Sequence, residues 1–338
     1  MIECIFTIDY EIYGNGEGSL RELVYEPAEK LKELFLKCNA RFVNFVEVAE
    51  MEAIEREGTD SAIGLIKHQI RDFHKEGFEL GLHLHPQWYN GRYEDGRWLL
   101  DYNEYNLCTL PRERIEQIVD RSIIYFRDVL GQTEFTPISF RAGNWLFQPT
   151  RIAADVLAER GIKVDSSVFK GGLLHRHKLD YRPALGNAYY WMFKDNVDIP
   201  ESAGNMLELP IYTQMVPIWK KLTTKRIGLQ RKVSSGMNTS QKKLYLLWDA
   251  LRLYHPLKLD FCRMTLAELT SMIDKIILED QSDPTVLKPI VAIGHTKDLV
   301  DFKTVELFLS YLQMKGIKIS TFEDVFTKCQ VPSAKCQV

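Results

Sequence analysis

Short apolar segments typical of β-strands alternate with amphipathic segments typical of helices along most of the 338-residue chain. The helix-like segments run for about 10 to 20 residues, long enough to cross over between parallel strands. This alternation predicts an α/β protein with a parallel sheet, and the number of strand-like segments favours a barrel of about seven parallel strands. The strand-like segments are residues 3–9, 41–47, 79–85, 137–142, 161–167, 188–193, 206–212, 289–295 and 317–321.

Residues 212–260 interrupt this alternation. Residues 219–258 contain ten Lys or Arg side chains and a single acid, Asp249. We therefore expect one domain over residues 1–328, with an insertion at about 212–260 and a C-terminal tail over 329–338. The basic segment is either a solvated loop or a surface for an anionic sugar, a diphosphate group or a membrane.

The overall charge argues against a nucleic-acid partner, because 43 basic residues are balanced by 46 acidic ones. No apolar run is long enough to span a bilayer. The first residues include Glu3, Asp9 and Glu11, unlike a signal peptide. We therefore expect a cytoplasmic protein, with peripheral contact to the inner membrane face through residues 219–258 as one option.

Two acidic residues, Asp9 and Glu11, stand at the end of the first predicted strand. Side chains at positions i and i+2 of an extended segment point to the same side, so both carboxylates can face one cavity. In a parallel α/β fold this edge carries the active site. Two carboxylates held together can divide the work, one binding a metal and the other moving protons.

Two histidines, His83 and His85, have the same spacing at the end of another predicted strand. Neutral imidazoles and a carboxylate can form a three-ligand metal site with an open position. Gln87 is an alternative partner for His83. Pro86 disfavours the helical turn that this pair would need, and glutamine is a poor ligand for zinc-like ions.

Three further strand ends carry reactive side chains, namely Arg141, Asp165 and His295. An arginine at such a position can hold a catalytic carboxylate ionised and oriented. A histidine directly after a buried strand is well placed to act as a general acid. The sequence thus predicts one site built from five strand ends.

Taken in order, these five segments resemble the motifs of the polysaccharide deacetylase family, also called the NodB-homology family and carbohydrate esterase family four. The resemblance covers roughly residues 3–325 and suggests a divergent cytosolic branch. It implies a distorted (β/α) barrel of the NodB-homology type that removes acetyl groups from sugars with a divalent metal, for which zinc is our expectation.

The resemblance also implies roles for individual residues. Asp9 is similar to the family's general base, Arg141 to the arginine that tethers it, and His295 to the general acid. Asp165 is similar to the aspartate that orients this acid. The main chain at Asn144 and Trp145 would contribute to the oxyanion hole.

Two metal positions depart from the family pattern, since Tyr10 and Gln87 stand where the family has metal ligands. The resemblance then implies a metal site formed by Glu11, His83 and His85, with Gln87 as the alternative to His85. Trp88 and Trp145 are candidates for stacking on sugar faces.

The resulting hypothesis is a metal-dependent amidohydrolase acting on C–N bonds other than peptide bonds. It would remove an N-acetyl or other small N-acyl group from a nucleotide- or lipid-linked amino sugar during surface polysaccharide or lipopolysaccharide biosynthesis. One alternative is a metal-free glycoside hydrolase that uses Asp9 or Glu11 with Asp165 or Glu208. Another is a sugar-binding protein without catalysis, for which Tyr10 and Gln87 are the motivation.

Overall fold

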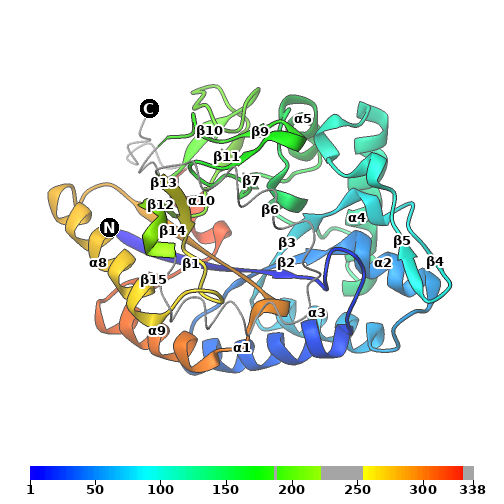
Figure 1. Cartoon of the computed structure of the whole chain (residues 1–338), viewed down its shortest axis with the longest axis horizontal. Helices are drawn as coiled ribbons and strands as arrows, with labels where there is room; N and C mark the ends of the chain where they lie inside the picture. The colour runs from blue at the N-terminus through cyan, green and yellow to red at the C-terminus, as the bar shows by residue number, and fades with distance from the viewer. Residues whose placement is uncertain (186–188, 222–253, 330–338) are drawn as a thin grey trace.

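The computed structural model describes residues 1–185, 189–221 and 254–329 (Figure 1). Its centre is a curled sheet in which, within these residues, seven neighbouring strands run parallel. Their order across the sheet is β11 (Met206–Glu208), β7 (Val164–Asp165), β6 (Ser139–Ala142), β3 (Glu79–Leu84), β2 (Val43–Glu47), β1 (Ile2–Tyr10) and β14 (Lys288–His295). The predicted α/β fold is confirmed.

Two more strands extend this sheet. β10 (Trp191–Phe193) pairs antiparallel with β11 at one edge. β15 (Lys318–Ile319) pairs with the beginning of β1, whereas β2 pairs with its end. This arrangement leaves the last residues of β1 between β2 and β14.

The two sides of the curled sheet meet through isolated bridges. Ile211 forms parallel bridges with Phe169 and with Val291 of β14, and the Tyr212 N–H donates to the Val291 carbonyl at 3.0 Å. A further bridge joins Asp260 to Ile293. The barrel is therefore distorted, because single bridges close it where a regular barrel has a continuous ladder.

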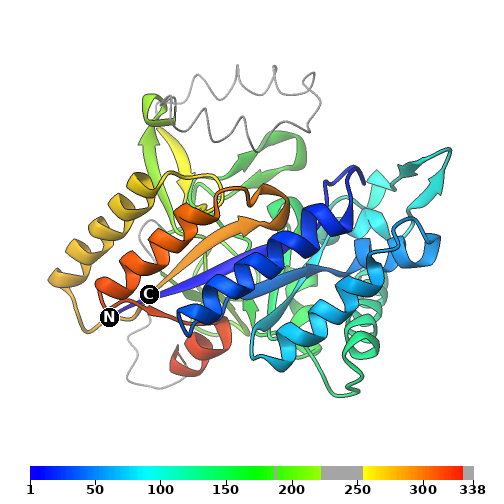
Figure 2. The same ribbon diagram turned by 90° about the horizontal axis from the view of Figure 1, so that it is seen from below.

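Helices cover the outside of the sheet, as Figures 1 and 2 show. Phe6 of β1 explains how they attach, since its ring packs edge-on against Phe35 and Phe308 of two covering helices. The covering α-helices are α1 (Glu26–Lys37), α2 (Val48–Glu57), α3 (Ile63–Lys75), α4 (Arg112–Leu130), α5 (Arg151–Glu159), α8 (Leu266–Ser282), α9 (Phe302–Met314) and α10 (Phe322–Cys329).

Within the described residues, three antiparallel strand pairs project from the barrel: β4 (Arg92–Glu94) with β5 (Arg97–Leu99), β8 (Leu173–Leu174) with β9 (Leu179–Asp180), and β12 (Thr213–Pro217) with β13 (Tyr254–Lys258). The β12–β13 hairpin forms the described part of the predicted insertion. Residues 222–253, with most of its basic side chains, lie outside the described residues. So do residues 330–338 of the predicted tail.

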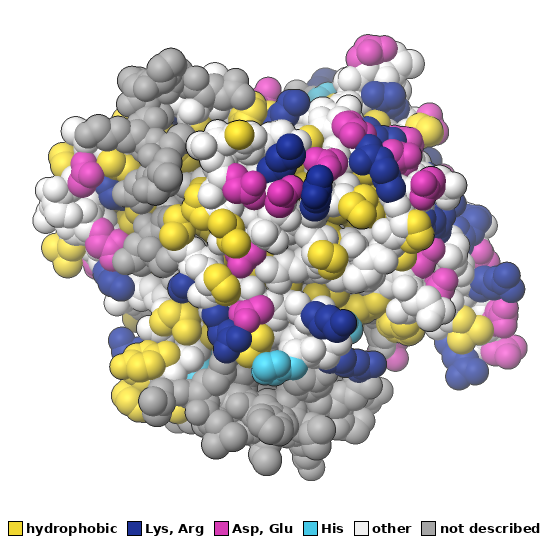
Figure 3. All heavy atoms as spheres, turned by 90° about the horizontal axis from the view of Figure 1, so that it is seen from above, with side chains coloured by type: hydrophobic (Ala, Val, Ile, Leu, Met, Phe, Trp, Pro, Cys, Tyr) yellow, Lys and Arg dark blue, Asp and Glu magenta, His cyan; other side chains and the backbone are white. Residues whose placement is uncertain are grey.

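In the part of the chain that the structure describes, no helix combines the length and the apolar character needed to cross a bilayer. Figure 3 shows basic and acidic side chains interspersed over one face of the molecule. Opposite charges also pair between α4 and the end of α5, where Arg160 contacts Asp120 and Arg112 contacts Glu159. The described residues of this face thus mix charges of both signs.

Candidate active site

The carboxyl ends of β1, β3, β6 and β14 bring the predicted residues together, because parallel strands end at the same edge of a sheet. The strand register places Asp9 opposite His295 and His83 opposite Arg141. Asp9 and Arg141 are almost fully buried. Buried charged groups need partners of opposite charge or hydrogen bonds, and such pairs make up the site at this edge of the sheet.

Three side chains converge as a candidate metal site. Oε2 of Glu11 lies 3.6 Å from Nε2 of His83 and 3.3 Å from Nε2 of His85. Their ligand atoms all lie within 4.8 Å of one another. Two imidazole nitrogens and a carboxylate oxygen are the donors of catalytic zinc sites, so these residues fit a divalent cation with an open position.

The orientation of His83 supports this interpretation. Its Nδ1 lies 2.8 Å from the main-chain carbonyl of Arg141, which can only accept a hydrogen bond. Nδ1 therefore carries the proton, and Nε2 presents its lone pair toward Glu11 in the neutral ring. Burial disfavours the charged ring, but the carboxylates of Asp9 and Glu11 outweigh it and raise the pKa of His83 to about 9.

His85 is held from behind by two amides. Its Nδ1 lies 3.1 Å from the Asn144 amide and 3.4 Å from the Gln87 amide. Gln87 thus supports His85 from behind and does not take its place beside Glu11. Gly143 makes room for the ring, because a Cβ at this position would lie 2.4 Å from the Leu84 carbonyl oxygen and 2.7 Å from Cγ of His85.

Tyr10 lies on the opposite side of β1 from this cluster. Its hydroxyl donates to Gln69, and its ring packs edge-on against Phe73 of α3. The alternation of β1 therefore sends Asp9 and Glu11 to one face and Tyr10 into the core. Glu11 supplies the carboxylate that Tyr10 lacks.

Lys297 is a member of the site to which sequence reasoning assigned no role. Its ammonium lies 2.8 Å from Oε1 of Glu11 and donates to the Ile12 carbonyl at 2.9 Å. Burial raises the pKa of Glu11, but Lys297 and the two histidines outweigh this effect and hold it well below its usual value. Glu11 is therefore ionised, with Oε1 on the lysine and Oε2 toward the histidines.

Asp9 is fixed by Arg141. Nη1 of the guanidinium donates to Oδ1 of Asp9 at 2.6 Å, Nη2 donates to the Thr7 hydroxyl at 2.9 Å, and Nε donates to the Ser166 carbonyl at 2.9 Å. Burial opposes ionisation of Asp9, and Arg141 outweighs it, so the pKa of Asp9 lies below its ordinary value. The structure thus provides a charged and oriented carboxylate with Oδ2 still available.

His295 faces this carboxylate, with Nε2 3.3 Å from Oδ2 of Asp9. On its other side, Nδ1 faces Oδ2 of Asp298 at 3.6 Å, and Asp298 accepts from Nε of Arg263 at 2.7 Å. Burial lowers the pKa of His295, while Asp9 and Asp298 act against this effect. Burial outweighs the two carboxylates, so the protonated ring gives up its proton more readily than an exposed histidine does.

The prediction that Asp165 orients His295 needs correction. Asp165 accepts from the main-chain N–H and the hydroxyl of Ser167, at 3.1 and 2.7 Å, and its carboxyl group lies close to that of Glu208. Asp298 takes the expected position beside Nδ1 of His295. Burial raises the pKa of both Asp165 and Glu208, which favours the protonated form of each carboxyl group.

The two predicted sugar-stacking residues differ. Trp88 is fully buried and packs edge-on against Trp98, so its predicted role as a stacking surface is wrong. Trp145 is half-buried, and its ring centre lies 6.4 Å from that of His295. Asn144 and Trp145 both have positive φ, at 54° and 64°, an uncommon conformation in which the Tyr181 hydroxyl holds the Trp145 carbonyl at 2.7 Å.

Two buried glutamates behind the site were also missed. Glu47 ends β2, and its Oε1 accepts from the N–H of Glu50 at 3.3 Å. Glu50 in turn accepts from the Ile12 N–H at 2.9 Å. Burial raises the pKa of Glu47 to about 8. The position of Glu47 at a strand end was the available signal, because the same argument selected Asp9 and His83.

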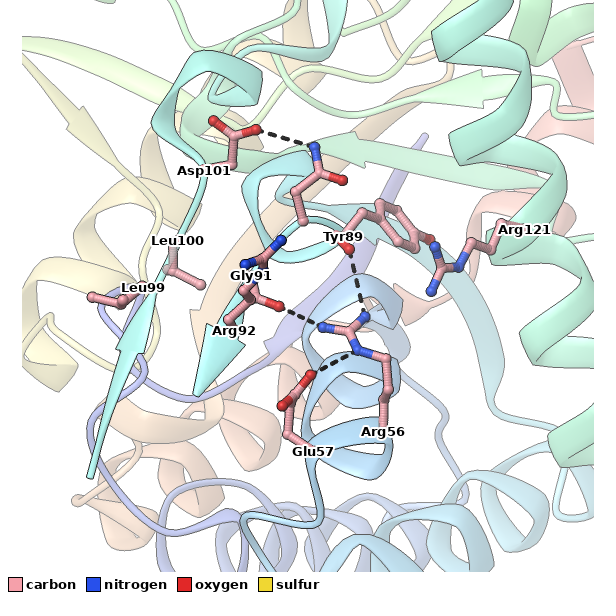
Figure 4. A pocket seen from close by; sticks show the side chains of 10 residues that line it. Arg56, Glu57, Tyr89, Gly91, Arg92, Leu99, Leu100, Asp101 and Arg121 are labelled. Carbon is pink, nitrogen blue, oxygen red and sulfur yellow. Dashed lines mark hydrogen bonds and ion pairs between the residues drawn. The ribbon is translucent and has the colours of Figure 1, made fainter. Parts of the chain in front are cut away.

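A separate hollow of about 720 Å³ lies beside the β4–β5 hairpin (Figure 4). Two of its three arginines are engaged locally, since Arg56 donates to the Tyr89 and Gly91 carbonyls and Arg121 pairs with Glu52. The lining comes from α2, α4 and the hairpin region. The reactive groups are thus gathered at the strand ends and not in this hollow.

Comparison with solved structures finds the same fold in polysaccharide deacetylases. A protein from Mycobacterium smegmatis described as a polysaccharide deacetylase shares 15% sequence identity at a TM-score of 0.52, with 99% of this chain and 92% of that chain covered. Another from Pseudomonas aeruginosa shares 14% at a TM-score of 0.50, covering 98% and 91%. The predicted NodB-type (β/α) barrel is therefore confirmed.

The same barrel also occurs in a glycoside hydrolase family 57 branching enzyme from Thermococcus kodakaraensis. This enzyme shares 10% identity at a TM-score of 0.55, with 96% of this chain and 71% of that chain covered. No protein-family model and no curated protein sequence matches the chain. At these identities the likeness shows the fold, and the chemistry must be argued from the site.

Proposed function

We propose that this chain is a metal-dependent hydrolase that removes an N-acetyl or other small N-acyl group from an amino sugar. The observation that carries the proposal is the position of Asp9. Arg141 holds one of its oxygens, and His295 faces the other. The three candidate metal ligands lie beside this pair. A base, its tether, an acid and a metal site are the parts that amide hydrolysis requires.

Glu11, His83 and His85 would hold the divalent cation, which we expect to be zinc. A cation bound there supplies a Lewis acid that polarises a carbonyl group and lowers the pKa of water. Asp9 accepts a proton from the attacking water at Oδ2. As the C–N bond breaks, His295 gives a proton to the leaving nitrogen from Nε2. The products are a carboxylic acid and a free amino sugar.

The strained turn at Asn144 and Trp145 completes this arrangement. Main-chain N–H groups there are proposed to stabilise the oxyanion that develops on the acyl oxygen. Asn144 also contacts His85 through its side chain, so one residue connects the turn to the candidate metal site. Trp145 offers a half-buried aromatic surface next to His295 for the sugar.

The biological substrate is a further part of the proposal. A nucleotide- or lipid-linked amino sugar of surface polysaccharide or lipopolysaccharide biosynthesis would suit the basic composition of residues 219–258. The same composition would suit a cytoplasmic protein that contacts the inner membrane face. Most of this segment lies outside the described residues, so its composition is the support.

A metal-free glycoside hydrolase is the second candidate, because the barrel also occurs in a branching enzyme. Such an enzyme needs two carboxyl groups that flank the scissile bond. Burial raises the pKa of Asp165 and of Glu208 and favours their protonated forms. The other two carboxylates, Asp9 and Glu11, are engaged by Arg141 and Lys297. The geometry thus favours the deacylase.

Metal content and acetate release test the proposal together. Untagged protein would be compared with Glu11→Ala, His83→Ala and His85→Ala, and Gln87→Ala is the matched control. We expect near-stoichiometric metal that is lost in the first three variants and retained in the control. Acetate release from N-acetylated sugar oligomers or sugar nucleotides should follow the metal. Absence of metal after supply of zinc, cobalt, nickel or manganese would contradict the mechanism.

A further inference from the structure

Lys258 is a cation at the rim of the site that the proposed reaction does not use. It ends β13, and its ammonium lies 4.1 Å from the ring centre of Trp145 and 4.7 Å from that of Phe169. Across residues 1–185, 189–221 and 254–329, no carboxylate or carbonyl group forms a hydrogen bond or ion pair with this ammonium. Aromatic faces attract a cation but do not neutralise it.

The carboxylates near Lys258 are already engaged. Asp9 is bound by Arg141. Asp260, two residues along the chain, accepts from the main-chain N–H groups of Cys262 and Arg263 at 3.1 and 3.0 Å. Burial lowers the pKa of Lys258 to about 8, and Asp260 and Asp9 only partly offset this effect. A half-buried ammonium without a direct anion is the group that an anionic ligand would satisfy.

Lys258 also lies close to the reacting groups. The Trp145 ring contacts Lys258 and packs edge-on toward His295, with 6.4 Å between the ring centres. The guanidinium of Arg141 lies 5.6 Å from the same indole ring. A sugar that places its acyl nitrogen at His295 can therefore present another substituent to Lys258 across Trp145.

We propose that Lys258 binds a carboxylate of the substrate, so that the substrate class is an N-acylated amino sugar bearing an acid group, as in an aminouronate. This inference rests on the proposed deacylase function. A carboxylate matches the single charge of one ammonium. A phosphate ester would bring a second negative charge close to Asp260 and Asp298. Among the described residues, no second unpaired cation lies at this position to balance that charge.

Binding measurements test this proposal directly. Calorimetry would compare the methyl glycoside of N-acetylglucosaminuronate, its neutral methyl ester and N-acetylglucosamine 1-phosphate. We expect the unaltered protein to bind the uronate at least about tenfold more tightly than the ester, a difference of about 1.4 kcal/mol. Lys258→Met should reduce this ratio to near one, and Lys258→Arg should keep most of it. Lys303→Met, on the exposed side of α9, removes the same charge and should preserve the ratio.

Equal affinities for the uronate and the ester in the unaltered protein would overturn the proposal, as would a preference that survives Lys258→Met. Tighter binding of the phosphate than of the uronate would overturn the choice of a carboxylate. Acetate release measured on the same samples separates the two proposals. Carboxylate-dependent binding without acetate release would support the role of Lys258 and contradict the deacylase. Acetate release without a carboxylate preference would support the deacylase and contradict the role of Lys258.

Discussion

Lys297 contacts Oε1 of Glu11 at 2.8 Å, while Oε2 of the same carboxylate faces both His83 and His85. The ammonium thus fixes a candidate metal ligand and also places a positive charge next to the cation site. These two effects act in opposite directions on metal affinity, because like charges repel strongly at short distance in a buried site.

We expect the repulsion to dominate in Lys297→Met. Metal-stripped protein of this variant should bind zinc about tenfold more tightly than the unaltered protein, as measured by competition with a chelator. Lys303→Met is the control for the loss of one charge at a distance. Weaker zinc binding in Lys297→Met would show instead that orientation of Glu11 is the main contribution of the lysine.

Asp9→Asn should separate chemistry from metal binding. Loss of the general base should lower kcat by roughly 10²- to 10⁴-fold. The amide retains an acceptor for Arg141 but leaves its charge without a partner, so the free energy of unfolding should fall by about 3 kcal/mol. Metal content should remain. Asp274→Asn on the surface of α8 is the control. If Asp9→Asn lost as much metal as the variants of Glu11, His83 and His85, Asp9 would belong among the metal ligands.

Asp298→Asn tests which carboxylate sets the pKa of His295, the proposed general acid. The negative charge of Asp298 raises the pKa of His295 against the effect of burial. Its removal should lower that pKa, so the protonated acid is lost at a lower pH and the alkaline limb of the kcat/KM profile moves to lower pH. Asp165→Asn should move this limb less, because Asp165 contacts Ser167 and Glu208. The opposite ranking would restore Asp165 to the role predicted from the sequence.

Glu208→Gln should change stability with a distinct pH dependence. Burial raises the pKa of Glu208 well above its usual value, so the folded protein keeps a proton that the unfolded chain releases. The stability of the unaltered protein therefore falls as the pH rises above the ordinary carboxyl pKa of about 4.3. The variant keeps an acceptor for the Val168 N–H and avoids this loss.

We expect Glu208→Gln to unfold at a higher denaturant concentration than the unaltered protein at pH 8, with a smaller difference at pH 5. Glu306→Gln, on the exposed face of α9, should show no such trend. Loss of acetate release comparable to that in Asp9→Asn would instead place Glu208 among the groups that the proposed deacylation requires.

The carboxylate preference assigned to Lys258 should depend on pH. The lysine is charged below its pKa of about 8 and neutral above it. Among the charged groups around it, Asp9 and Arg141 form one pair, while Asp260 lies close to Arg263. The affinity for the uronate should therefore fall as the pH rises from 7 to 9, while that for the methyl ester stays constant. A preference that persists at pH 9 would point to another cation.

The sequence predicted the side chains whose direction follows from strand geometry. Alternation along an extended segment places Asp9 and Glu11 on one face, and His83 and His85 likewise. Lys297 and Asp298 follow His295 by two and three residues, but they lie at a short helical turn (Thr296–Asp298), where strand alternation no longer gives the direction of a side chain. Their roles therefore required the structure.

Burial of side chains and contacts between distant parts of the chain were the other features that the sequence did not predict. Trp88 and Trp145 are equally plausible stacking residues in the sequence, and only packing separates the buried Trp88 from the half-buried Trp145. Lys258 was one of ten basic residues in a segment read as a loop or surface patch. The β12–β13 pairing returns it to the site from a position more than 90 residues beyond Asp165 in the sequence.

The barrel closure described above has a consequence for how such an enzyme can diversify. The reacting groups are anchored on neighbouring parallel strands with a continuous hydrogen-bonded ladder, from β14 through β1 to β6. Lys258 stands on a hairpin attached near the seam, where isolated bridges at Ile211 and Asp260 hold the sheet together. Substitutions at this seam can reshape the choice of substrate while the hydrolytic centre stays intact. Under the proposed function, a chain with this barrel could exchange one sugar for another without changing its catalytic residues.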